Sequence, residues 1–148
     1  METATMGRVL TDLTVSNLGD LYEVEQGRRA ADQVRTAAIT GALVDSGAST
    51  LALTTDLIDR LGLTRRYKKQ VRTAGGLRDV NVCGLVRVEI MGREAFVDPM
   101  ELPPGSPILV GQLVLEAMDW VIDMRNHRLI GNPEHGGEQM LELWTFLD

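Results

Sequence analysis

Short apolar runs separated by turn-forming residues follow one another along most of the 148-residue chain. Mixed apolar and polar residues predict strands over residues 7–15, 18–24 and 33–44, with a turn at residues 17–20 between the first two. Strict alternation in the third strand gives it two faces, one with Ile39, Gly41 and Leu43 and the other with Thr40, Ala42 and Val44.

Hairpin patterns dominate the middle and the end of the chain. Residues 71–82 centre on Gly75-Gly76, and a turn at these glycines pairs Thr73 with Arg78, Arg72 with Asp79, Ala74 with Leu77 and Val71 with Val80. Residues 85–90 and 94–97 predict a second hairpin, and residues 120–124 and 128–130 predict a third.

Two segments have helical periodicity. Residues 54–62 carry an apolar stripe of Leu57, Ile58 and Leu61, and Gly62 ends this helix. Residues 112–118 form the second, with Leu113, Val114, Ala117 and Met118 expected on one side. Many short strands with two short helices predict a closed, barrel-like all-β domain.

The pattern divides the chain into a flexible amino terminus at residues 1–6, one domain at residues 7–132 and a carboxyl-terminal tail at residues 133–148. Residues 140–147 are apolar on both alternating faces, so we expect them to be covered by other protein atoms. Gly136-Gly137 precede this segment and indicate a flexible loop, with an anion-binding nest as the weaker alternative.

Composition narrows the class of protein. The net charge of −6 argues against a nucleic-acid partner, and the basic cluster of Arg65, Arg66, Lys68 and Lys69 indicates a solvated loop. No apolar run has membrane-spanning length, and the lone Cys83 predicts a reducing compartment and a buried, unreactive thiol. We expect a cytoplasmic protein without a metal or cofactor, in which His127 and His135 are solvated.

One carboxylate stands out because it directly follows an apolar strand. Asp45 comes after Leu43 and Val44 and before the small residues Ser46, Gly47 and Ala48, whose backbone N–H groups can approach it. Asp45 is therefore either an ordinary turn residue or a catalytic acid held at the end of a strand.

Two landmarks together carry a family resemblance. Leu43-Val44-Asp45-Ser46-Gly47-Ala48-Ser49 is followed by a helix ending in Leu61-Gly62-Leu63, a Gly75-Gly76 hairpin, and Pro107-Ile108-Leu109-Val110-Gly111. Over residues 7–132 this order resembles the retropepsin-like aspartic proteases. The resemblance implies a homodimer that cleaves peptide bonds with an Asp45 dyad, one aspartate from each chain.

The resemblance also implies roles for the neighbouring residues. Ser46, Gly47 and Ala48 would support the active-site loop, and Ile108, Leu109, Val110 and Gly111 would pack against it. The segment Thr73, Ala74, Gly75, Gly76 and Leu77 would be the flap over a peptide or protein substrate, and residues 140–147 would supply strands to the dimer interface.

The chain departs from the viral pattern at one supporting pair. An arginine and an aspartate that pair in viral enzymes correspond here to Gln112 and Ser49, which can form at most a neutral hydrogen bond. The alternative function is a catalytically silent dimerisation or peptide-binding module with the same fold. A third hypothesis is a precursor-processing enzyme whose amino terminus is trimmed on activation.

Overall fold

The computed structural model describes residues 8–143. Its main feature is a nine-stranded sheet with the order β4-β5-β8-β3-β9-β2-β1-β6-β7, and a separate two-stranded sheet pairs β10 with β11. The strands are β1 Val9–Asn17, β2 Thr36–Val44, β3 Leu51–Thr54, β4 Arg65–Thr73, β5 Gly76–Cys83, β6 Val86–Ile90, β7 Arg93–Val97, β8 Met100–Leu102, β9 Leu109–Val110, β10 Trp120–Asp123 and β11 Arg128–Gly131.

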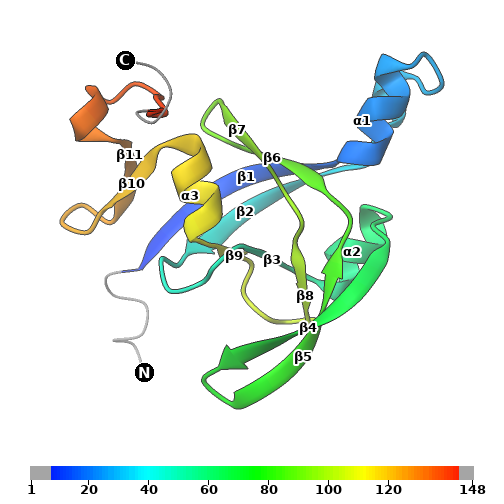
Figure 1. Ribbon diagram of the computed structural model, residues 1–148, viewed down its shortest axis with the longest axis horizontal. Coiled ribbons are helices and arrows are strands. Elements are labelled where there is room, and N and C mark those ends of the chain that lie inside the picture. Colours follow the sequence, from blue (N-terminus) through cyan, green and yellow to red (C-terminus); the bar gives the residue numbers. More distant parts are fainter. Residues whose placement is uncertain (1–7, 144–148) are drawn as a thin grey trace.

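Three α-helices accompany the strands within the described residues: α1 Leu18–Glu25, α2 Thr55–Arg60 and α3 Gln112–Met118. Short 3-10 turns lie at Ala31–Gln33 and Pro133–His135. Helix α3 packs against β7 and β10. Figure 1 shows α1 at one end of β1 and β2. None of these helices has the length and apolar character needed to cross a membrane.

The predominantly β character is confirmed, but the prediction of a closed barrel is wrong. The sheet curls (Figure 1), and in the described part of the chain its outer strands β4 and β7 do not pair with each other. Short strands β3 and β8, which the sequence did not predict, connect the β4–β5 hairpin to the rest of the sheet.

The strand predicted at residues 18–24 is helix α1, so the prediction of two helices is also wrong. Asn17 is the N-cap and not a turn residue, since its side-chain oxygen accepts a hydrogen bond from the Asp20 backbone N–H at 3.0 Å. Its amide nitrogen donates to the Leu61 carbonyl at 2.8 Å, which connects the start of α1 to the end of α2.

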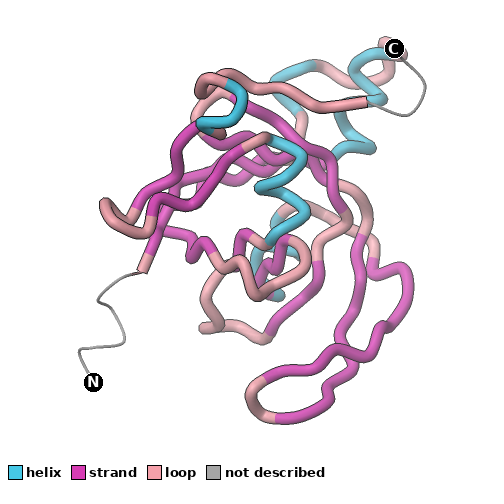
Figure 2. The backbone as a smooth tube through the Cα atoms, turned by 60° about the vertical axis from the view of Figure 1, so that its left-hand side comes forward, coloured by secondary structure: helices cyan, strands magenta, loops and turns pink. Residues whose placement is uncertain are grey.

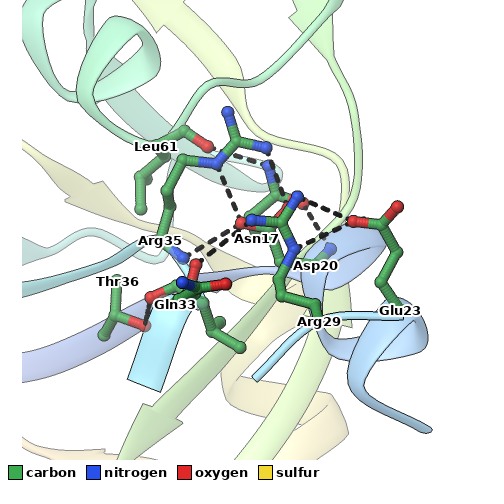
Figure 3. A network of polar contacts seen from close by, with 9 residues as sticks. Asn17, Asp20, Glu23, Arg29, Gln33, Arg35, Thr36 and Leu61 are labelled. Atoms are coloured by element: carbon green, nitrogen blue, oxygen red, sulfur yellow. Dashed lines mark hydrogen bonds and ion pairs between the residues drawn. The ribbon is translucent and has the colours of Figure 1, made fainter. Parts of the chain in front are cut away.

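A buried carboxylate connects α1 to Arg35, the residue that precedes β2 (Figure 3). The Asp20 side chain, only 3% exposed, accepts two hydrogen bonds at 2.8 Å from the Arg35 guanidinium, and Arg29 lies 3.3 Å away. The hydrogen-bonded Arg35 side chain lowers the pKa of Asp20 to about 2, although burial opposes the shift. Asp20 is therefore ionised at neutral pH.

The predicted faces of β2 are wrong beyond Ile39 because the strand contains a bulge. Register against β1 shifts between Thr11 and Leu13, and Gly41 takes a φ of +70° there. The bulge reverses the alternation, so Ile39 and Ala42 are both buried while Gly41 is exposed.

The hairpin of β4 and β5 exists, but its predicted register is wrong by two residues. Arg72 pairs with Leu77 and Val71 with Arg78, so the turn lies at Ala74–Gly75. Only Gly76 takes a positive φ, and the Thr73 hydroxyl fixes the turn by donating to the Gly76 carbonyl at 2.8 Å. The basic residues Arg65 to Lys69 lie in β4 and not in a loop.

The other two hairpins and both predicted helices are confirmed. Met91 and Gly92 form the β6–β7 turn with positive φ values, and Gly62 follows α2 with a φ of +64°. The predicted face of α3 is wrong, because Val114, Leu115 and Met118 are buried whereas Leu113 and Ala117 are exposed.

One hydrophobic core joins the sheet to α2 and α3. Its largest fully buried side chains include Leu51, Leu53, Ile58, Leu61 and Met118. Cys83 belongs to this core as a free thiol, and burial raises its pKa to about 11. The predicted unreactive role of Cys83 agrees with that position.

Candidate active site

Asp45 follows the last residue of β2, the strand that runs parallel to β9. Leu43 pairs with Leu109 and Val44 with Val110, and the Asp45 backbone N–H donates to the Val110 carbonyl at 3.0 Å. The two segments singled out as landmarks are therefore adjacent strands, although they lie far apart in the sequence.

The loop after β2 turns around the Asp45 carboxylate. Its Oδ1 accepts a hydrogen bond from the Gly47 backbone N–H at 2.9 Å, and the Asp45 carbonyl accepts one from Ala48 at 3.0 Å. Asp45 is half-buried, while Ser46 and Gly47 are exposed. No other carboxylate bonds to Asp45 in residues 8–143, and the Ser46 side chain makes no hydrogen bond there.

Helix α3 holds the far side of this loop through backbone groups. The N–H of Gln112 donates to the Ala48 carbonyl at 2.9 Å, and that of Leu113 donates to the Ser49 carbonyl at 3.0 Å. The Gln112 side chain bonds instead to Glu116 at 2.9 Å. Main-chain hydrogen bonds thus connect residues 112 and 49, and a Gln112 side-chain bond to Ser49 is absent from the described structure.

Gly111 makes this close approach possible. A Cβ built on Gly111 would overlap the Thr50 carbonyl oxygen and lie 2.7 Å from the carbonyl oxygen of Ala48. Both atoms belong to the backbone of the Asp45 loop, which cannot retreat without losing its hydrogen bonds. Only glycine fits at this position, so Gly111 allows the chain after β9 to pack directly against the Asp45 loop.

A groove of about 410 Å³ separates the Asp45 loop from the β4–β5 hairpin. Its lining includes the apolar residues Ala52, Met100, Leu102 and Leu109, together with the loop residues Gly47, Ala48, Ser49 and Thr50. Figure 2 shows the hairpin as an arm that extends beyond the body of the protein. The Thr50 hydroxyl is buried and has no hydrogen-bond partner within the described residues.

The predicted flap residues have unequal positions. Thr73 lines the groove, whereas Ala74, Gly75, Gly76 and Leu77 lie at the turn beyond it, and Leu77 is half-exposed. The groove residues on β4 and β5 were not predicted from the sequence. They are Lys69, Gln70, Val71, Arg72 and Val80. Alternation along β4 could have indicated some of them, but only with the correct register.

The prediction that His135 is solvated is wrong. Its side chain is 11% exposed, with Nδ1 2.6 Å from an Asp119 carboxylate oxygen and Nε2 2.7 Å from one of Glu142. These hydrogen bonds raise the pKa of His135 and lower that of Asp119. His127, in contrast, is exposed in its turn as predicted.

This Asp119–His135–Glu142 cluster fastens the carboxyl-terminal segment to the end of α3. The Met140 backbone N–H donates to the same Asp119 carboxylate at 3.0 Å. Met140, Leu141 and Leu143 are exposed and form no strand with this chain, and the rest of the predicted tail lies outside the described residues. Its role at a dimer interface stays a prediction.

Comparison with known proteins gives one family match. A family model described as aspartyl protease matches residues 33–113, which include β2, the Asp45 loop, the β4–β5 hairpin, β9 and the start of α3. No curated protein matches the chain. The matched segment spans more than half of the chain and contains both landmarks, so the protein belongs to an aspartyl protease family of the retropepsin-like clan.

Proposed function

We propose that the protein is a homodimeric aspartic endopeptidase in which Asp45 of each chain supplies one catalytic carboxylate. The observation that carries the proposal is the support of Asp45: its loop is hydrogen-bonded to β9 and α3, and residues 47–50 of this loop line an apolar groove. An ordinary turn aspartate needs only its local bond to Gly47 and no such scaffold.

The chemistry of this family requires two adjacent carboxylates, and the described chain brings only one to the loop. A twofold axis beside Asp45 would place the residue next to its own copy. Two exposed leucines flank the loop: Leu10, which pairs with Leu43, is 54% exposed, and Leu113, which bonds to Ser49, is 56% exposed. Exposed apolar side chains around the site are consistent with a partner surface.

In such a dimer the two Asp45 carboxylates share one proton, because like charges that close cannot both be ionised. The ionised aspartate removes a proton from a water molecule, which attacks the scissile carbonyl, while the protonated one hydrogen-bonds to the carbonyl oxygen. The aspartate that took the proton from water then donates a proton to the leaving amine. The activity should follow a bell-shaped pH profile on the acid side of neutrality that belongs to the pair.

The test compares wild type with Asp45→Asn on a mixed peptide library between acid and neutral pH. We expect wild type to cleave peptides and Asp45→Asn to lose at least about a hundredfold in activity, since a neutral amide cannot act as the general base. Asp32→Asn is the matched control, because Asp32 is exposed and distant from the loop in sequence.

Two results would contradict the proposal. Equal cleavage by wild type and Asp45→Asn would show that Asp45 is not a catalytic residue. A wild type that forms dimers but cleaves nothing at any pH would support the alternative of a catalytically silent module.

A further inference from the structure

The charge of the β4–β5 hairpin is opposite to that of the whole chain. The protein has a net charge of −6. Residues 65–83 nevertheless contain six of its 15 basic residues and a single acidic one, Asp79. The arm that covers the groove is therefore basic.

The pairing register shows which basic side chains belong to the groove. Lys69, Val71 and Thr73 occupy one face of β4, with Val80 directly opposite Lys69. Val71 is the only half-buried residue of β4, so this face is the one turned toward the body. Lys69 lines the groove from this face. Arg72 lies on the other face of β4 but also lines the groove, unlike Lys68 on that same face.

These two cations have no counter-ion within the described residues. Neither Asp nor Glu lines the groove, and neither Lys69 nor Arg72 makes an ion pair or a side-chain hydrogen bond in residues 8–143. Arg65, in the same hairpin, differs because Glu101 and Asp59 bind its guanidinium at 2.8 and 2.9 Å. The charge of Lys69 and Arg72 is thus available to a ligand.

We propose that the groove selects acidic peptides, in which a Glu or Asp side chain close to the scissile bond contacts Lys69 or Arg72. This inference rests on the proposed function and specifies its substrate class. Apolar walls formed by Val71, Val80 and Leu109 accommodate the neighbouring side chains. No aromatic residue lines the groove, so it lacks the stacking surface typical of single-stranded nucleic-acid sites.

The first experiment takes one peptide that wild type cleaves and varies each position within four residues of the scissile bond among Glu, Gln and Lys. We expect at least one position where Glu gives about fivefold higher kcat/KM than Gln, and Lys a lower value than Gln. The difference should shrink as salt is raised. Equal rates for Glu, Gln and Lys at every position would overturn the proposal.

The second experiment exchanges the charge of the groove. Lys69→Glu and Arg72→Glu should remove the preference for Glu or reverse it toward Lys. Lys68→Glu is the matched control, since it makes the same change in net charge one residue away on the opposite face of β4, outside the groove. An identical shift in all three variants would assign the effect to overall charge and overturn the proposal.

A binding measurement separates this inference from the proposed function. Fluorescence anisotropy of a labelled acidic peptide with Asp45→Asn needs no turnover. Binding that Lys69→Glu abolishes, in a protein that never cleaves, would contradict the peptidase and support the acidic ligand. Cleavage without a charge preference would support the peptidase and contradict the acidic ligand. A Lys69-dependent preference for an RNA oligonucleotide over the acidic peptide would overturn the inference.

Discussion

At Gly111 a single methyl group decides whether the Asp45 loop can form. We expect Gly111→Ala to lower the free energy of unfolding by about 2 kcal/mol or more, because the added Cβ overlaps backbone atoms of residues 48 and 50. Chemical denaturation measures the change. Gly84→Ala is the control, since its nearest neighbour would be at an ordinary 3.9 Å, and an equal loss in both variants would contradict the role of Gly111.

Single residues differ in how far the sequence reveals them. Asp45 and Gly111 could be singled out because each directly follows an apolar strand. A carboxylate in that position, and a glycine in that position, are both unusual local patterns. Lys69 could not, since it is one basic residue among several in a row and only the strand register separates it from Lys68. His135 was missed because its partners, Asp119 and Glu142, lie elsewhere in the sequence.

At the scale of elements, the connection between α1 and Arg35, the residue that precedes β2, depends on the ionised Asp20 carboxylate. Its pKa is lowered in the folded state, so its stabilising effect is present above the ordinary value of 3.8 and is lost as pH falls toward 2. We expect Asp20→Asn to lower the unfolding free energy at neutral pH by about 2 kcal/mol.

Denaturation of wild type and Asp20→Asn as a function of pH tests this. The difference between them should be constant from pH 7 to about 5 and should diminish below about 4, where wild type also loses the charge. A difference that is the same at pH 2.5 and pH 7 would show that Asp20 acts through packing and not through its charge.

The helices and strands differ in how well local sequence patterns predict them. The β6–β7 hairpin and α2 were predicted because Gly92 and Gly62 take the positive φ values that such ends require. Helix α1 was missed, since its apolar and polar residues mix over only eight positions and its Asn17 cap resembles a turn signal. The β4–β5 register was missed because two adjacent glycines leave the turn position open, and the Thr73 hydroxyl decides it.

At the scale of the whole molecule, the proposed activity requires two chains, so specific activity should fall on dilution below the dimer dissociation constant. We expect Leu113→Asp to shift the protein toward monomer and to reduce activity in parallel, because it places a charge beside the Asp45 loop. Sedimentation velocity and peptide cleavage at matched concentrations provide the two measurements.

Phe96→Asp is the control for that variant. Phe96 is exposed to a similar extent, 52%, but lies on β7 at the opposite end of the strand order from the flap hairpin. A monomeric wild type at high concentration that still cleaves peptides would contradict the shared site. Dissociation by Phe96→Asp and not by Leu113→Asp would place the interface elsewhere.

The parallel pairing of β2 with β9 has a consequence for the order of events during synthesis. The chain is made from its amino terminus, so the Asp45 sequence emerges long before residues 109–113, whose backbone completes its loop. Contacts between distant segments also form slowly. A nascent chain therefore contains Asp45 without the backbone that completes its loop, and an incomplete chain released early lacks the proposed active site.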